Sequence, residues 1–401
     1  MLVRDGARGV FIESLTYGVF MKYLKSPIVI TALGLGLAMI CSAENVSPRS
    51  AQSSASAFDD TTATTVPRHE KVQVTDGIYL FLSPDIDGIE VDGNSIVVVG
   101  DRDLLVFDTN VLPSSASGIL DEIRKITDRL VRYVVNSHWH PDHWDGNEVY
   151  AKRFPDLEII SSADSRRLME NSMHIYGKTL EKLSAAPAKQ MQESLRTGKN
   201  SDGSVLSDSD RKEFVEDLRA QKEFMAEYNS MHPVLPTLTF DHQLTLYHGG
   251  HEFRFMHFVG NTAGDTAVYL PKEKILLTGD LVTVPIPFAA DSHPSRWIAS
   301  LKTLTSLDID VIIPGHGPVQ HDKAYLELLT TSLQSVVDQV HEALARGLTL
   351  EQTRQFVKLD DIRKQFTHGD PNLDAQFDGN FVQPIVLQVY DEATEELERY
   401  Q

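Results

Sequence analysis

Short apolar runs separated by Gly, Asp and Asn recur along the chain from Val72 onward. Runs of this length, rich in β-branched and aromatic residues, are typical of strands joined by turns. In the first half of the chain they cover 77–82, 95–99, 104–107, 130–135 and 157–160. Apolar residues at helical spacing between 117 and 128 predict one helix among these strands.

The middle of the chain, over about 165–236, lacks this pattern and is rich in Lys, Glu, Gln, Met and Ala. This composition predicts an inserted helical segment. Strands are predicted again at 238–240, 243–247, 252–259, 267–270, 275–277 and 311–313, with a helix over 295–307. Residues 323–401 have a helical pattern, broken near 367–372, and form a predicted helical C-terminal extension. Two strand-rich halves, each accompanied by helices, predict an α+β fold in which two sheets pack face to face with helices outside.

The N-terminal residues have a different pattern, typical of an export signal. A basic stretch at 21–25 precedes an uncharged, mostly apolar run over 27–41 and small residues that end at Ala43. This pattern predicts a signal peptide over 1–43 with cleavage after Ala43, and a translation start at Met21 also fits it. The apolar run is short for a bilayer-spanning helix, so we expect no stable membrane insertion after cleavage; an uncleaved anchor helix is the alternative. Residues 44–70, rich in Ser, Ala and Thr, are predicted to be a flexible linker.

Composition and charge restrict the partners and the chemistry. The formal net charge of −20 would repel nucleic acid and anionic membrane surfaces, so we expect a small-molecule substrate and no nucleic acid. Cys41 is the only cysteine and lies in the predicted signal, so the mature protein would have neither a disulfide nor a thiolate metal ligand. We expect a periplasmic or secreted protein, and the sequence leaves its oligomeric state open.

The segment 138–143 (His-Trp-His-Pro-Asp-His) carries the strongest chemical signal. His138 and His140 lie two residues apart after a predicted strand, so an extended backbone would point both to one side. Pro141 then turns the chain, which brings Asp142 and His143 towards the same centre. Imidazoles and carboxylates are the ligands that zinc accepts when thiolates are absent. Four such groups exceed the needs of one tetrahedral ion, so the segment indicates one half of a two-metal site.

Two later strand ends supply further candidate ligands. Asp280 follows the run 275–277 and a glycine, and His316 follows the run 311–313 between two glycines. Glycine beside a ligand permits unusual backbone angles and a close approach of the backbone to a metal.

With these motifs the chain resembles the metallo-β-lactamase superfamily. The His-x-His-x-Asp-His motif carries the resemblance, together with 260–265 (Gly-Asn-Thr-Ala-Gly-Asp), 278–280 (Thr-Gly-Asp) and 314–317 (Pro-Gly-His-Gly). The resemblance implies an αββα four-layer sandwich over 71–322 with a binuclear metal site at one edge. It places His138 and His140 on a first metal, Asp142, His143 and His316 on a second, and Asp280 between the two.

Asn261 departs from the family pattern, which has a histidine there as the third ligand of the first metal. An amide oxygen is a neutral and weak zinc ligand, so the first metal should be held less tightly. His257 could substitute only if its strand bends. Three states follow: a weakened two-zinc site with Asn261 as a tentative ligand, a one-metal enzyme that uses Asp142, His143, Asp280 and His316, or a protein without activity.

We expect a zinc-dependent hydrolase in which metal-bound hydroxide, oriented by Asp142, attacks an ester, lactone, thioester or amide-type bond. A β-lactamase proper, a non-catalytic metal-binding or ligand-binding protein of the same fold, and a di-iron oxidoreductase are the alternatives. Asp108 and Thr262 are candidate partners of the ligand histidines. The substrate-binding residues are unknown from the sequence; the candidates near the pocket are Trp139, Phe288, His293 and Arg296.

Overall fold

The computed structural model describes residues 69–83, 85–86, 89–90, 92–173 and 176–399 of the chain. The predicted signal peptide, 1–43, lies outside these residues. The predicted linker, 44–70, also lies outside them except for its last two residues, and Glu70 already begins strand β1 (Glu70–Thr75).

A seven-stranded mixed sheet is built from strands between residues 70 and 240, in the order β1-β2-β5-β6-β7-β8-β9. Its remaining strands are β2 (Ile78–Leu82), β5 (Ser95–Val99), β6 (Leu104–Phe107), β7 (Val131–Val135), β8 (Glu158–Ser162) and β9 (Leu238–Phe240). The strands from β1 to β6 pair antiparallel, and those from β6 to β9 pair parallel. The apolar runs therefore predicted these strands correctly, apart from β1, whose two valines alternate with polar residues and form no continuous apolar run. A short pair, β3 (Asp85–Ile86) and β4 (Ile89–Glu90), was not predicted.

The second sheet has five strands in the order β10-β11-β12-β13-β14. They are β10 (Gln243–His248), β11 (His251–Phe258), β12 (Asp265–Leu270), β13 (Ile275–Leu277) and β14 (Val311–Ile313). β13 and β14 pair parallel, so their carboxyl ends lie next to each other at one edge of the sheet. This pairing brings the predicted ligands Asp280 and His316, which follow these two strands, to the same place.

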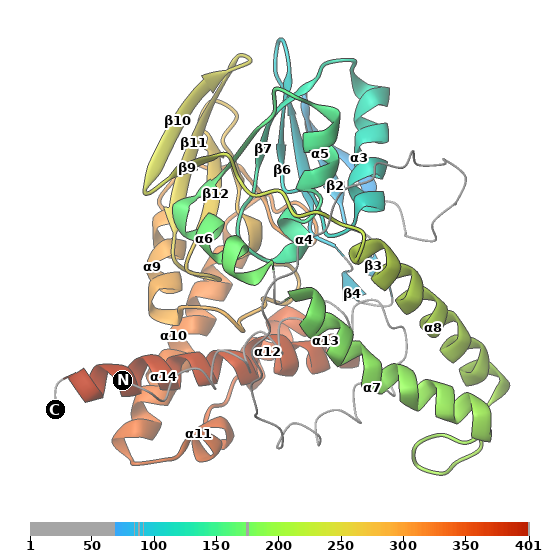
Figure 1. The fold of residues 1–401 in the computed structure, drawn as a ribbon. Helices are drawn as coiled ribbons and strands as arrows, with labels where there is room; N and C mark the ends of the chain where they lie inside the picture. The colour runs from blue at the N-terminus through green and yellow to red at the C-terminus, as the bar shows by residue number, and fades with distance from the viewer. Residues whose placement is uncertain (1–68, 84, 87–88, 91, 174–175, 400–401) are drawn as a thin grey trace.

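Four layers result from the alternation of side chains along the strands. Ile96 and Val98 of β5 pack between the two sheets, against Phe253 and Phe255 of β11. Val97 of the same strand faces the other way, against helix α3 (Pro113–Ile126). The outer face of the second sheet packs in the same manner on α9 (Pro294–Thr305) and α10 (Ala324–Ala345). The αββα sandwich predicted from the resemblance is confirmed (Figure 1).

The remaining helices follow the predicted organisation. Near the first sheet lie α4 (Pro141–Trp144) and α5 (Asn147–Arg153). The insertion contains α6 (Ala163–Ser172), α7 (Tyr176–Thr197) and α8 (Asp208–Tyr228), and the α7–α8 pair extends away from the sheets in Figure 1. The C-terminal extension contains α10, α11 (Leu350–Phe356), α12 (Asp360–Thr367), α13 (Pro371–Gln376), η2 (Phe377–Val382) and α14 (Gln383–Arg399).

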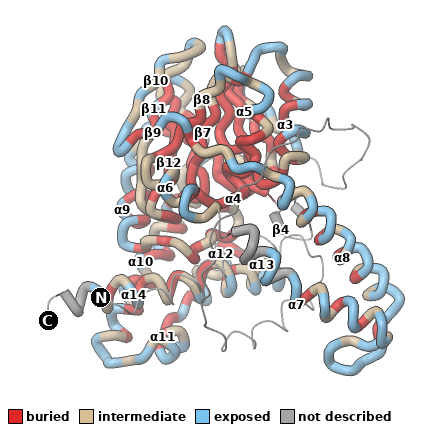
Figure 2. Tube along the Cα trace, viewed as in Figure 1, coloured by how far each residue is buried: buried red, intermediate tan, exposed pale blue. Residues whose placement is uncertain are grey.

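Buried residues concentrate in the two sheets and in the helices that cover them (Figure 2). The C-terminal helices belong to the largest apolar cluster, in which Phe377, Phe381 and Ile385 pack with Trp297 of α9 and Leu276 of β13. The extension is therefore an integral part of the outer helical layer. Among the described residues, no helix has both the length and the apolar character that crossing a membrane requires.

Candidate metal centre

The histidine motif begins where β7 ends, at the edge of the first sheet that faces the ends of β13 and β14. The His140 backbone is extended and α4 starts at Pro141, so His138 and His140 point to one side while Asp142 and His143 return towards them. The rings of His138 and His140 have centroids 4.4 Å apart, and those of His138 and His143 are 4.3 Å apart. The convergence predicted from the spacing is therefore present, with a short helix in place of a simple turn.

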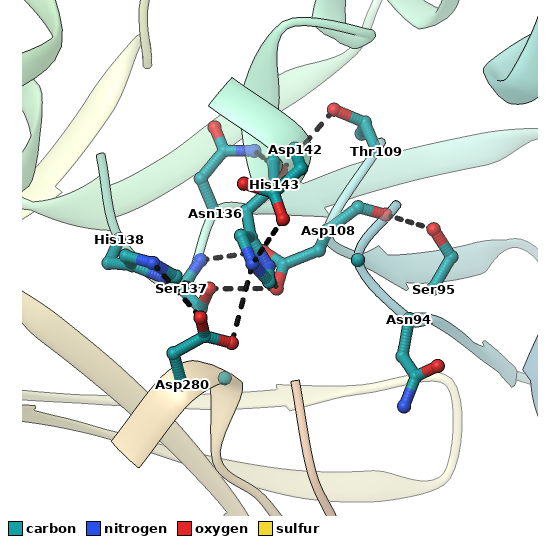
Figure 3. Close-up of polar contacts among 12 residues, drawn as sticks. Asn94, Ser95, Asp108, Thr109, Asn136, Ser137, His138, Asp142, His143 and Asp280 are labelled. Atoms are coloured by element: carbon teal, nitrogen blue, oxygen red, sulfur yellow. Dashed lines mark hydrogen bonds and ion pairs between the residues drawn. The ribbon is translucent and has the colours of Figure 1, made fainter. Parts of the chain in front are cut away.

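Two groups of ligand atoms converge in this region. His138, His143 and Asp280 form one group, and Asp142, His143 and His316 form the other; within each, the ligand atoms lie within 4.8 Å of one another. His143 Nε2 belongs to both groups, at 3.4 Å from Asp280 Oδ1 and 3.5 Å from Asp142 Oδ2. Figure 3 shows Asp280 reaching towards His138 and His143 from the opposite sheet.

Asp280 lies between the two groups. Its Oδ2 is 3.8 Å from His138 Nε2, and its Oδ1 is 3.6 Å from His316 Nε2. His316 Nε2 is also 3.2 Å from Asp142 Oδ2, which closes the second group. A carboxylate in contact with three imidazoles has the placement that the resemblance implies for a bridging ligand.

Glycines at the strand ends allow this close packing. Gly279 has a φ of +52°, and a Cβ there would lie 2.4 Å from the Cβ of Ser137. A Cβ on Gly315 would lie 2.1 Å from Asp280 Oδ1. Both positions therefore require glycine, for conformation in one case and for space in the other.

Unsatisfied polar atoms indicate that a cation fits here. Among the described residues, His138 Nε2, His143 Nε2 and Asp280 Oδ1 are buried and have no hydrogen-bond partner. Buried polar atoms are almost always paired, so three orphaned atoms that face one another need an explanation. A divalent cation supplies one, because all three are lone-pair donors of the type that zinc accepts.

Asp108 fixes the orientation of the ligand rings. Its Oδ2 accepts from His143 Nδ1 at 2.8 Å and from the Ser137 hydroxyl at 2.7 Å, and its Oδ1 accepts from the Ser137 amide (Figure 3). The Ser137 hydroxyl also contacts His138 Nδ1 at 2.9 Å. Both rings therefore use Nδ1 for a protein partner and turn Nε2 towards the centre, as is usual for metal-bound histidines. The suggestion that Asp108 supports the ligand histidines agrees with this geometry. The same suggestion for Thr262 was wrong, since its hydroxyl donates to Asp265.

The charges in the centre depend strongly on one another. Burial lowers the pKa of His143, but the carboxylates of Asp280, Asp142 and Asp108 outweigh it and hold this pKa well above its usual value. Burial raises the pKa of Asp280, and the neighbouring histidines reverse the shift and keep it well below its usual range. Burial and the nearby rings hold the pKa of His138 well below its usual value. His138 is therefore neutral at pH 7, with a lone pair available on Nε2.

The remaining candidate ligands, His140 and Asn261, lie outside both groups. His140 Nε2 contacts Asp291 Oδ2 at 3.2 Å. Asn261 is fully buried; its amide nitrogen donates to the carbonyl of Phe288, and its Oδ1 has no partner among the described residues. An orphaned amide oxygen in this position fits the role of a weak metal ligand.

His257 is not placed to replace the missing histidine. Its Nδ1 contacts the carbonyl of Asp241 at 2.7 Å, and its Nε2 contacts the carbonyl of Ala263 at 3.2 Å. Both ring nitrogens are therefore engaged by backbone groups, which corresponds to a packing role.

Apolar side chains border the centre on the side of His140. Trp139 and Phe288 contact the His140 ring edge-on, with centroids 5.1 and 5.9 Å away. They belong to a cluster with Met169, Leu168, Met173 and Leu235 from the insertion. His293 and Arg296, the other two candidates, lie outside this cluster, at the start of α9. The sequence did not single out Asp291, because a lone aspartate before a helix has no local signal that separates it from an ordinary turn residue.

Comparison with known proteins agrees with this geometry. The sequence profile of the Metallo-beta-lactamase superfamily matches residues 88–316. A linear primary-alkylsulfatase from Pseudomonas sp. (strain ATCC 19151) is 27% identical over 267 residues, which cover 64% of this chain and 48% of that protein. The chain thus spans about half the length of this curated relative.

A solved alkylsulfatase structure shows the same fold. The stereoselective inverting sec-alkylsulfatase Pisa1 from Pseudomonas sp. has a TM-score of 0.54 at 16% identity, covering 81% of this chain and 50% of that one. A metallo-beta-lactamase from Pontibacter korlensis has a TM-score of 0.48 at 19% identity, covering 67% of this chain and 99% of that one. The profile match extends over more than half of the chain and includes every residue of the two ligand groups, and the chain therefore belongs to the metallo-beta-lactamase superfamily.

Proposed function

We propose that the protein is an exported, zinc-dependent hydrolase of small molecules with an ester, lactone, thioester or amide-type bond. The observation that carries the proposal is the pair of buried ligand groups that share His143. Family membership supports the same class, a metal-dependent hydrolase of unknown substrate. We propose two zinc ions per chain, the first held weakly because Asn261 offers only an amide oxygen.

The residues of the metal centre have separate roles in the proposed reaction. Zinc at these ligands would act as a Lewis acid and lower the pKa of water to about 7. Asp142 lies beside His143 and His316, so its carboxylate is placed to orient the attacking water and to accept its proton. Asp280 holds the two groups at a fixed separation. Trp139 and Phe288 exclude water on the side of His140.

A sulfate ester is the second candidate substrate. The relative named as a linear primary-alkylsulfatase favours it, and the apolar cluster beside His140 would suit an alkyl substituent. A β-lactamase proper is the less favoured alternative, because Asn261 would weaken the first metal.

Elemental analysis and a substrate panel test the proposal. The purified protein should contain one to two equivalents of zinc. It should hydrolyse at least one member of a panel of lactams, lactones, thioesters and alkyl sulfates. A chelator should abolish this turnover, and added zinc should restore it. A protein that gains no turnover after zinc addition would contradict the hydrolase proposal and favour a binding protein. Iron in place of zinc would favour the oxidoreductase alternative.

The export proposal has its own test. Expression of the full chain in a Gram-negative host, followed by fractionation and N-terminal sequencing, should give a periplasmic protein that begins at Glu44. An uncleaved protein in the membrane fraction would instead indicate an anchor helix.

A further inference from the structure

One loop contacts both outlying candidates, His140 and Asn261. It covers 284–291 and connects η1 (Gly279–Leu281) to α9. The carbonyl of Phe288 accepts from Asn261, and the carboxylate of Asp291 contacts His140. Two side chains from separate strand ends are therefore oriented by a single segment.

The contact with Asp291 selects one nitrogen of His140. A carboxylate can only accept a hydrogen bond, so His140 Nε2 donates to Asp291 and the lone pair is left on Nδ1. His138 and His143 show the opposite arrangement, with Nδ1 engaged and Nε2 turned inward. Asp291 thus determines which nitrogen His140 offers to a metal.

The contact with Phe288 selects one end of the Asn261 amide. A backbone carbonyl accepts only, so the amide nitrogen of Asn261 must point to Phe288. The oxygen then points the other way, where it is buried without a partner among the described residues. Phe288 therefore contacts both candidates, Asn261 through its carbonyl and His140 through its ring.

The C-terminal extension holds this loop in place. The hydroxyl of Tyr325 on α10 lies within hydrogen-bond distance of the carbonyls of Thr283 and Pro285, between which its single proton is shared. The amide of Ala289 donates to the carbonyl of Asn380 in η2 at 2.9 Å, and the side chain of Gln388 on α14 donates to the carbonyl of Ala290. All three anchors come from residues beyond 316, where the family profile ends.

We propose that the loop 284–291 positions the ligands of the first metal, His140 and Asn261, and that the C-terminal helices hold the loop for this purpose. Asp291 is the main positioning residue, since it acts through His140. The inference rests on the metal site of the proposed function. It adds a role for the extension that does not depend on the identity of the substrate.

Metal affinity of the variant Asp291→Asn tests the proposal directly. Zinc binding to the full chain would be measured by competition with a chromophoric chelator, and cobalt substitution would report the coordination of the first site. We expect about 10–100-fold weaker binding of the first zinc, the range seen when such outer partners are lost, and a changed cobalt spectrum. Binding of the second zinc should stay unchanged.

Asp103→Asn is the matched control. It removes a carboxylate from a different histidine, the half-buried His248, at the far end of the strands. This variant should bind zinc like the unmodified protein. Tyr325→Phe removes the hydroxyl that contacts Pro285 in the loop and Thr283 just before it. It should weaken the first site in the same direction, by a smaller factor. Tyr325→Phe can also test the proposal if Asp291→Asn does not fold.

The outcomes separate this inference from the proposed function. Unchanged affinity and spectrum in Asp291→Asn, while the unmodified protein binds two zinc ions, would overturn the positioning role alone. Equal losses at both sites would also overturn it, because they would indicate general destabilisation. Failure of the unmodified protein to bind zinc would overturn both the inference and the proposed function.

Discussion

The two halves of the metal centre are built in different ways. Asp280 and His316 follow strand ends and stand beside glycines, while Asp142 and His143 lie in the short helix α4 after β7. Their ligand atoms converge within the segment that the family profile covers. His140 and Asn261 are oriented through a loop that the C-terminal helices hold. The first arrangement depends on backbone geometry, while the second depends on packing between distant parts of the chain. In the proposed two-zinc site, the second metal would therefore belong to the robust half and the first to the adjustable half.

Replacement of His143 should have the largest effect, because His143 is the one residue common to both ligand groups. In His143→Ala, zinc should fall below one equivalent per chain. Turnover should fall by more than the 10–100-fold typical of outer partners, to the level of the chelated protein. Elemental analysis and the rate on the best substrate measure these effects. Retention of two zinc ions would show that the two ligand groups do not depend on His143 as a shared ligand.

Asp108→Asn should weaken zinc binding in the robust half without changing the local backbone conformation. Asp108 has a φ of +63°, which asparagine tolerates, so the chain conformation should be kept. An amide can donate to His143 Nδ1, which would move the ring proton to Nε2, the atom that faces the centre. Zinc affinity should fall about 10–100-fold, as measured by chelator competition. Unchanged affinity would mean that Asp108 does not set the state of the ring.

Asn261→His should strengthen the adjustable half. One imidazole nitrogen can donate to the carbonyl of Phe288, and the other can offer a better zinc ligand than an amide oxygen. The affinity for the first zinc should rise by a factor of at least about ten. Zinc occupancy at a limiting zinc concentration measures this change. The affinity of the second site serves as the internal control. If neither occupancy nor affinity changes, Asn261 does not face the metal.

Asp92→Asn should have the smallest effect, which is a change in the pH dependence of the free energy of unfolding. Burial raises the pKa of Asp92 to about 7. A raised carboxyl pKa stabilises the fold at low pH, and this contribution is lost as the pH rises from about 4 to about 7. The variant should not show this decrease in stability with rising pH. At pH 8 its free energy of unfolding should exceed that of the unmodified protein by about 1–3 kcal/mol. Urea unfolding of the metal-free protein at pH 5 and pH 8 measures it, and an equal pH dependence in both proteins would contradict it.

Much of the fold was predictable because strand periodicity and turn residues are local signals. The runs 95–99 and 104–107 coincide with β5 and β6. Strand β1 and the short helix α4 were missed, since neither has a continuous apolar run. The candidate ligands Asp280 and His316 were also predictable, because each follows a strand and stands next to glycine, and Asp142 and His143 were predictable from the spacing of the histidine motif around Pro141.

The sequence by itself determined which residues can bind a metal, because ligand chemistry depends on residue type and local spacing. Only the tertiary structure decided how they are oriented. It engages both ring nitrogens of His257 with backbone carbonyls, leaves the oxygen of Asn261 unpaired, and brings Asp291 to His140 across 151 positions of the chain. Such contacts depend on how sheets and helices pack, and no local pattern of residues encodes them.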